Sequence, residues 1–248
     1  MRRLVNFVAL AAVIGQGAAA QSGAPQAPRA VVELFTSQGC SSCPAADKVL
    51  SDIARDPSVI ALSLNVDYWD YLGWRDTLAL HGHSNRQRAY AGARGDRNVF
   101  TPQAVINGTA QVIGSDKAAL ETAIAQARAA PLPVTIKVED GKILVTLPAA
   151  RDEQKSGEVW LCPVTSKANV AVGRGENGGR QLTYTNVVRR WIKLGDWNGE
   201  EKTFSASVAD LGDANIPLKE LDRVAVVLQA GIAAKPGRML GAAVAALK

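Results

Sequence analysis

Apolar and polar positions divide this chain into two halves with different periodicity. Up to about residue 130, short apolar runs alternate with segments in which apolar residues recur every three or four positions. The first pattern predicts strands and the second predicts helices. Strands are predicted at 31–35, 59–66, 103–106 and 111–113, and helices at 46–54, 85–93 and 116–129.

The order of these elements is strand, helix, strand, helix, hairpin, helix, which is the order of a thioredoxin-like α/β fold. The run 59–66 is apolar throughout, as expected for a parallel strand that is covered on both faces. Asn107-Gly108 joins the last two strands and is a strong hairpin signal, because these residue types tolerate positive φ. We therefore expect a thioredoxin-like domain over residues 31–130.

The second half has the two-residue period of strands. Val134, Ile136 and Val138 alternate with polar residues, and Asp140-Gly141 then turns the chain. Further strand-like segments lie at 143–147, 158–164, 182–194, 202–208, 223–230 and 238–246, although the last is rich enough in alanine to be helical. Short strands separated by turn signals favour a β-sandwich-like all-β domain over residues 131–248.

The N-terminus has the three parts of a secretory signal peptide. Arg2-Arg3 precedes the apolar segment Leu4–Ile14, and Ala18-Ala19-Ala20 matches a cleavage site. A membrane anchor needs about 20 apolar residues, and this segment is shorter. We expect residues 1–20 to be removed after Ala20, residues 21–30 to form a disordered leader, and the protein to be secreted or periplasmic without stable membrane insertion.

Composition narrows the function classes. Removal of the two N-terminal arginines reduces the formal net charge from +5 to +3, a mild excess that does not favour nucleic acid as a partner. The chain has only three cysteines, one pair and one odd thiol, which is too few for a scaffold held together by disulfides. The pair is therefore better explained by function than by stabilisation.

Two cysteines separated by two residues, Cys40 and Cys43, lie where a predicted strand meets a predicted helix. The unpaired N–H groups and the dipole at a helix N-terminus stabilise a thiolate and lower its pKa. We expect Cys40 to be the nucleophile and Cys43 the resolving thiol of a redox pair. A metal half-site and a structural disulfide remain alternative interpretations of the same motif.

Two further positions are candidates for the redox site. Thr101-Pro102 lies just before the predicted hairpin, where thioredoxin-fold proteins place a cis-proline beside the disulfide and use the preceding residue to hold a substrate backbone. Glu33 lies in the middle of the first strand, and burial there would suit a carboxyl group that moves protons beneath the cysteines. An ordinary proline at the start of a strand and an acid at a sheet edge are the alternatives.

Aromatic residues cluster in the loop after the second strand. Tyr68, Trp69, Tyr71 and Trp74 leave the same sheet edge as the cysteine motif, because the carboxyl ends of parallel strands share an edge. They are candidates for gripping a substrate peptide near the disulfide. Packing against the second half of the chain explains the same residues equally well.

Three other features carry weaker signals. His81 and His83 do not have the spacing of a zinc finger with the cysteines, so solvated histidines at a helix start are the simpler interpretation. Gly173–Gly178 matches the spacing of a dinucleotide-binding loop, but it lacks the strand–turn–helix context and is better explained as a hairpin loop. Cys162 lies in a strand pattern and is expected to be a buried, inert thiol.

Several strings in this sequence resemble a family of exported thioredoxin-like proteins, the domain of unknown function 1223 (DUF1223). The strings are Glu33–Pro44, Val66–Trp74, Arg86-Gln87 with Tyr90, Thr101–Gln103, Gly173–Asn177 and Tyr184–Arg189. Asn65 stands where the family pattern often has a histidine. The resemblance implies a thioredoxin-like fold with a β-rich companion domain and supplies no activity.

Together these patterns predict an exported thiol–disulfide oxidoreductase that acts on protein or small thiols through Cys40 and Cys43. It would use no cofactor and would depend on a redox partner. Two alternatives belong to other classes. The same two thiolates could carry Cu(I), since soft sulfur ligands select that ion, or the disulfide could be structural in a protein that only binds a partner.

Overall fold

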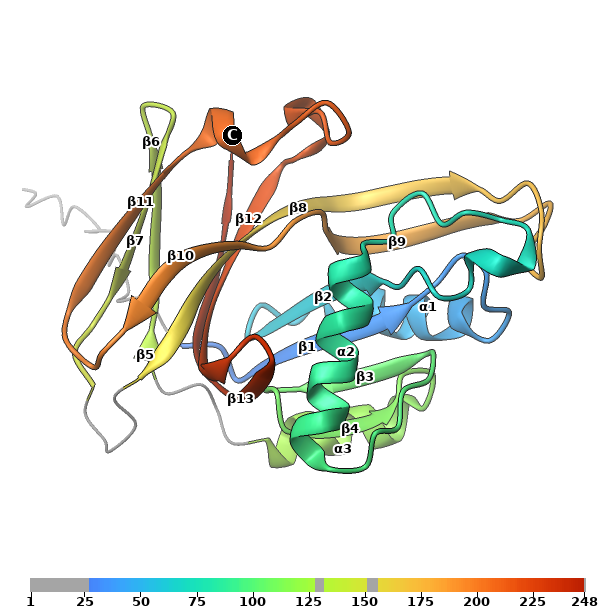
Figure 1. Cartoon of the computed structure of the whole chain (residues 1–248), viewed down its shortest axis with the longest axis horizontal. Coiled ribbons are helices and arrows are strands. Elements are labelled where there is room, and N and C mark those ends of the chain that lie inside the picture. Colours follow the sequence, from blue (N-terminus) through green and yellow to red (C-terminus); the bar gives the residue numbers. More distant parts are fainter. Residues whose placement is uncertain (1–26, 128–131, 151–155, 248) are drawn as a thin grey trace, which may run out of the picture.

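The computed structural model describes residues 27–127, 132–150 and 156–247. The predicted signal peptide and residues 21–26 of the predicted leader lie outside this part, as does the predicted boundary at residues 130 and 131. The chain forms a mixed α/β structure dominated by one large curled sheet (Figure 1). None of the helices in the described ranges is long and apolar enough to cross a membrane.

The first half alternates strands and helices in the predicted order. Its elements are β1 (Ala30–Thr36), α1 (Cys43–Ile53), β2 (Val59–Asn65), η1 (Asp70–Leu72), α2 (His81–Arg94), β3 (Gln103–Ile106), β4 (Ala110–Ile113) and α3 (Lys117–Gln126). Helix α2 begins four residues before its predicted start. Its sequence has little apolar periodicity, so the pattern does not mark where the helix starts. The hairpin turn is as predicted, with Asn107 and Gly108 at φ values of 48° and 74°.

The second half consists mostly of strands. They are β5 (Leu132–Pro133), β6 (Thr135–Glu139), β7 (Lys142–Leu147), β8 (Gly157–Ala171), β9 (Gln181–Val188), β10 (Ile192–Trp197), β11 (Lys202–Ser207), β12 (Arg223–Ile232) and β13 (Lys235–Ala246), with the short 3-10 turns η2 (Val208–Leu211) and η3 (Leu218–Glu220). The alanine-rich segment at the end is therefore a strand. The predicted strand at 182–194 is two strands, β9 and β10.

The two halves share one sheet. Its ten strands run in the order β4-β3-β1-β2-β9-β8-β12-β13-β5, with β10 paired to β8. The junction is a parallel pairing of Ser63 in β2 with Val187 in β9. Strands β6, β7 and β11 form a second, three-stranded sheet. The predicted order of an α/β half followed by a β-rich half is thus confirmed in secondary-structure content. The predicted sandwich-like domain is not confirmed, because strands of both halves belong to one sheet.

Strand β1 lies at the centre of the first half and separates two cores. Its residues alternate between faces with a period of two. Val32 and Leu34 pack with α1 and α3, whereas Val31 and Phe35 pack with Tyr90 of α2 and with strands of the second half. A third core joins the second sheet to the curled sheet. The sheet of the first half is therefore covered on one face by α1 and α3 and on the other by α2 and the second half of the chain.

Strand β8 is longer than predicted and carries the second half across to α1. It spans 15 residues and pairs with β9 as far as Ala171 opposite Gln181. Figure 1 shows this hairpin reaching the end of the sheet where α1 begins. Its loop is the glycine-rich segment, which confirms the interpretation of Gly173–Gly178 as a hairpin loop.

Candidate functional site

Cys40 and Cys43 form a disulfide at the junction of β1 and α1. Cys43 is the first residue of α1, and its N–H donates to the carbonyl oxygen of Cys40 at 3.2 Å. Both cysteines are buried, with 1% and 0% exposure, although Ser41 and Ser42 between them are exposed. Because the pair lies at a helix N-terminus, the helix dipole would stabilise a thiolate formed there.

Asp76 holds the loop that leads into the disulfide. Its carboxylate accepts hydrogen bonds from the backbone N–H groups of Gln38 and Leu78, each at 2.8 Å, and from the side chain of Asn65 at 3.0 Å. Asp76 is almost fully buried, and this burial raises its pKa. The loop between β1 and the cysteines is thereby attached to the end of β2.

A second buried acid, Asp47, lies one helical turn after Cys43 on the same buried face of α1. Burial, opposed by the nearby Thr36 hydroxyl and reinforced by the charge of Asp76, raises the pKa of Asp47 to about 8. Within the described residues its Oδ1 has no hydrogen-bond partner of normal geometry, and the same is true of buried oxygens of Thr36, Asn65 and Tyr184. The Asp47 carboxyl group therefore keeps its proton at neutral pH.

Thr101 and Pro102 are linked to the cysteine motif through Trp69. The indole N–H of Trp69 donates to the Thr101 hydroxyl at 2.8 Å, while the Cβ of Trp69 packs against Gly39, the residue before Cys40. The Thr101–Pro102 peptide bond is cis. Pro102 is buried and packs near Gly114, which also contacts α1. The structure thus brings the predicted proline segment to the same end of the sheet as the disulfide.

Gly39 is required by this close packing. A Cβ at this position would lie 2.9 Å from the Cβ and 3.3 Å from the carbonyl oxygen of Trp69. We expect Gly39→Ala to lower the free energy of unfolding in urea by about 1–3 kcal/mol, as overpacking typically does. The control is Gly92→Ala in α2, where a Cβ meets open space and helix propensity should raise stability by about 0.5–1 kcal/mol. A Gly39→Ala protein as stable as wild type would show that this contact is loose.

The aromatic residues of the 68–74 loop do not act as one surface. Trp69 and Trp74 flank the cysteine motif, since the indole N–H of Trp74 donates to Gln38 at 2.8 Å. Trp74 also packs against the β8–β9 loop, so packing against the second half is part of its role. Tyr68 donates to Gln87 of α2 at 3.1 Å, and Tyr71 is 78% exposed. Of the four, only Trp69 and Trp74 touch residues next to the disulfide.

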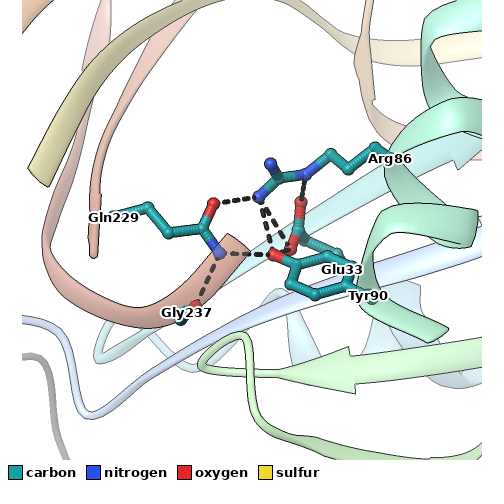
Figure 2. A network of polar contacts seen from close by, with 5 residues as sticks. All are labelled: Glu33, Arg86, Tyr90, Gln229 and Gly237. Atoms are coloured by element: carbon teal, nitrogen blue, oxygen red, sulfur yellow. Dashed lines mark hydrogen bonds and ion pairs between the residues drawn. The ribbon is translucent and has the colours of Figure 1, made fainter. Parts of the chain in front are cut away.

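Glu33 is buried in the central strand, one of the two placements that the sequence left open, but it belongs to a different network. Its carboxylate is held by Arg86 at 2.6 and 3.2 Å and by the Tyr90 hydroxyl at 2.5 Å (Figure 2). Arg86 and Tyr90 both contact Gln229 of β12. This network lies on the face of β1 opposite α1, because Glu33 shares the parity of Val31 and Phe35. The buried acid on the side of the disulfide is Asp47.

Three contributors to the site carry no local signal in the sequence. Asn177 and Glu176, from the β8–β9 loop, bind the backbone of residues 38–41. The hydrogen bonds from Ser41 lower the pKa of Glu176. Asp47 has the sequence context of an ordinary surface residue of a helix. The glycine spacing in 173–178 indicates a turn rather than a contact, and the family resemblance over Gly173–Asn177 singles out the segment without giving it a role.

The remaining candidates lie apart from the disulfide. His81 is exposed and its ring contacts Asp67, whereas His83 is buried against the carbonyl of Asn65 and burial lowers its pKa to about 4. Cys162 is free and buried, and burial raises its pKa, as expected for an inert thiol. In the described parts of the chain, no group of three or more His, Cys, Asp or Glu side chains is arranged to hold a metal ion.

The chain belongs to the family described as protein of unknown function DUF1223, whose sequence model matches residues 31–229. It is similar to protein AGR_C_4864 from Agrobacterium tumefaciens, known from a crystal structure, with 31% identity and a TM-score of 0.76 over 91% of this chain and 97% of that one. HBP35 of Porphyromonas gingivalis has a similar fold, with 12% identity and a TM-score of 0.57 over 90% and 76% of the two chains. A search of curated proteins finds no match.

Proposed function

We propose that this protein is an exported thiol–disulfide oxidoreductase, in which Cys40 exchanges with a substrate sulfur and Cys43 resolves the mixed disulfide. The observation that carries the proposal is the disulfide at the start of α1, directly after the central strand β1. A thioredoxin-like arrangement of the first half is supported by the strand order β4-β3-β1-β2, in which β1 and β2 are parallel and β3 is antiparallel to both neighbours.

The exchange follows from the chemistry of the pair. A substrate thiolate attacks the Sγ of Cys40, the Cys40–Cys43 bond breaks, and its electron pair leaves on the sulfur of Cys43. A second substrate thiolate then attacks the mixed disulfide and releases Cys40, so that the substrate is oxidised by two electrons and the pair is reduced. The reverse sequence reduces a substrate disulfide. The reduction potential of the pair against that of its compartment sets the direction.

Asp47 is suited to the proton transfer that accompanies these steps. It lies one turn from Cys43 on the same buried face of α1, and its carboxyl group is neutral at pH 7. A neutral acid can donate a proton to the Cys43 thiolate as it leaves and can accept it back when Cys43 attacks. We assign to Asp47 the role that the sequence suggested for Glu33, whose carboxylate is bound by Arg86.

Export completes the proposal. The charged, apolar and small-residue segments of residues 1–20 support a cleaved signal peptide, and disulfides persist in the oxidising compartments to which such peptides lead. Protein or small-molecule thiols and disulfides, together with a redox partner, are the expected reactants. No metal or organic cofactor is required by this chemistry.

The proposal is tested with purified protein lacking residues 1–20. We expect the Cys40–Cys43 pair to equilibrate with glutathione and to show one two-electron potential, and we expect Cys43→Ala to accumulate a mixed disulfide on Cys40. Cys162→Ala is the matched control, because it removes a cysteine that is buried and free, and it should leave the potential unchanged.

Two outcomes would count against an oxidoreductase. Failure of the pair to exchange with glutathione or dithiothreitol, while the unfolded protein does so readily, would favour a structural disulfide. Stoichiometric Cu(I) binding by the reduced protein that is lost in Cys40→Ser, without catalysed exchange, would favour metal carriage.

A further inference from the structure

The loop between β8 and β9 packs against the segment that contains Cys40. This loop, residues 172–180, is called the tip here. Asn177 at its end is fully buried and donates through Nδ2 to the carbonyl oxygens of Gln38 at 3.0 Å and Cys40 at 2.9 Å. The neighbouring Glu176 carboxylate accepts the N–H of Ser41 at 2.9 Å. Two consecutive residues of the second half thus bind three positions of the segment that contains Cys40.

The tip is built to present Asn177 in this position. The Oδ1 of Asn177 accepts from the guanidinium of Arg180 at 2.8 Å, which fixes the direction of its amide group. Backbone hydrogen bonds within the tip join Gly178 to Gly175 and Gly179 to Val172. A Cβ at Gly173 would lie 2.8 Å from the ring of Trp74, the side chain that also donates to Gln38. The tip and the cysteine loop therefore share one packed contact.

The cysteines have little room for an attacking thiolate while this contact is in place. An attacking thiolate must approach a sulfur along the axis of the disulfide bond, yet Cys40 is 1% exposed and Cys43 is 0% exposed. The serines between them are exposed, so solvent reaches the turn between the cysteines while the two cysteine residues are almost fully enclosed. Because the tip is hydrogen-bonded to Gln38, Cys40 and Ser41, its release would free this segment and increase access to Cys40. A protein thiol needs a larger opening than a small thiol does.

We propose that the tip is a gate that admits small thiols to the disulfide ahead of protein thiols, and that Asn177 is the residue that holds it closed. This inference rests on the proposed function. In the open form the thiolate of the small thiol bonds to the Sγ of Cys40 while the Cys40–Cys43 bond breaks and Cys43 leaves with the electron pair. The small thiol is the reductant and the protein disulfide is the oxidant, so no other reactant is needed.

The test measures the rate of reduction of the Cys40–Cys43 disulfide by dithiothreitol and by reduced ribonuclease A, in protein lacking residues 1–20. For wild type we expect the reaction with ribonuclease to be slower by at least tenfold. Asn177→Ala removes the two hydrogen bonds that join the tip to the cysteine segment, each of ordinary strength, and the one that Arg180 donates within the tip. It should raise the rate with ribonuclease at least tenfold and the rate with dithiothreitol less, so that the ratio of the two rates falls.

Asn169→Ala is the matched control. Asn169 is an exposed residue of the same hairpin that accepts a hydrogen bond from Thr183 and lies outside the tip, and its loss should leave both rates within twofold of wild type. If Asn177→Ala does not fold, Glu176→Gln at an exposed position still weakens the contact with Ser41 and should raise the ribonuclease rate several-fold.

The outcomes distinguish failure of the proposed gate from failure of the proposed thiol–disulfide exchange. An unchanged rate ratio in Asn177→Ala, or in Glu176→Gln where the former does not fold, would overturn the gate. So would a wild-type protein that reacts with ribonuclease as fast as with dithiothreitol. Absence of reaction with either thiol in wild type and in both tip variants would instead reject thiol–disulfide exchange as the function, and with it the gate.

Discussion

Arg86→Met is expected to lower the free energy of unfolding by about 3–5 kcal/mol, the range found when one partner of a buried ion pair is removed. Arg86 donates to both carboxylate oxygens of Glu33, to the Tyr90 hydroxyl and to Gln229. Glu33 has 0% exposure, so the substitution leaves a buried carboxylate without its cation. Equilibrium unfolding in urea, with the disulfide oxidised, measures the loss.

A control variant and a compensating variant show how much of the stability loss in Arg86→Met comes from the unpaired charge of Glu33 and how much from lost packing. Arg88→Met replaces an exposed arginine on the same helix and should change stability by less than about 0.5 kcal/mol. Adding Glu33→Gln to Arg86→Met removes the stranded charge and should recover part of the loss. The explanation fails if Arg86→Met stays within 1 kcal/mol of wild type, or if the double variant is no more stable than the single one.

The same network explains why the halves behave as one structure. Glu33 and Arg86 belong to the first half, and Gln229 of β12 reaches them from the second while its amide also donates to the carbonyl of Gly237 in β13 at 2.8 Å (Figure 2). Hydrophobic residues of β8 and β12 pack on the same face of β1. With a shared sheet and a buried polar network that Gln229 joins from the second half, the two halves should unfold in a single transition, including in the variants above.

Local sequence patterns were sufficient for the elements around the disulfide, because their signals are short-range. The short apolar run at 31–35, the Asn107-Gly108 turn and the apolar run of β2 each report the local backbone. The position of Cys40 and Cys43 between strand and helix followed from these signals. Burial of Glu33 was one of two placements that the sequence left open, and its cation lies 53 residues away, with no spacing rule to connect the two.

The parts that could not be predicted depend on contacts between distant segments. Asp47 is buried because β9 packs against α1, and the sequence of the helix alone gives it the appearance of a surface residue. Asn177 reaches Cys40 only because β8 continues to Ala171, well beyond its apolar segment. The sheet shared by the two halves was not predicted for a related reason, since the pairing of Ser63 with Val187 that joins the halves has no signature in either strand.

Asp47→Asn is expected to stabilise the oxidised protein and to change its dependence on pH. Burial raises the pKa of Asp47 from 3.8 to about 8, so between these values the folded protein holds a proton that the unfolded chain has released. The stability contributed by Asp47 therefore falls as pH rises from about 4 to about 8 and changes no further above that range. At 1.36 kcal/mol per pH unit the loss at pH 7 is on the order of 4 kcal/mol, and asparagine, which does not titrate, should recover it.

The pH series and its control identify the group responsible. Asp76 and Tyr184 are the ionisable side chains that act on Asp47 from the neighbouring loop and from β9, and both remain in Asp47→Asn. The stability difference from wild type should be near zero at pH 4 and should grow until pH 8. Asp52→Asn, in the same helix but half-buried and paired with Arg55, should show no such growth.

Under the proposed function, the same substitution should slow thiol–disulfide exchange while it stabilises the fold. An amide cannot give a proton to the leaving Cys43 thiolate, and loss of a general acid–base group typically costs about 10²-fold or more in rate. We expect the release of Cys43 to slow by this order at pH 7 in Asp47→Asn, and to be unaffected in Asp52→Asn. A faster or unchanged reaction combined with higher stability would show that Asp47 is only a buried acid. A slower reaction would show that the Asp47 carboxyl group, although it destabilises the fold, supplies the proton to the leaving Cys43 thiolate.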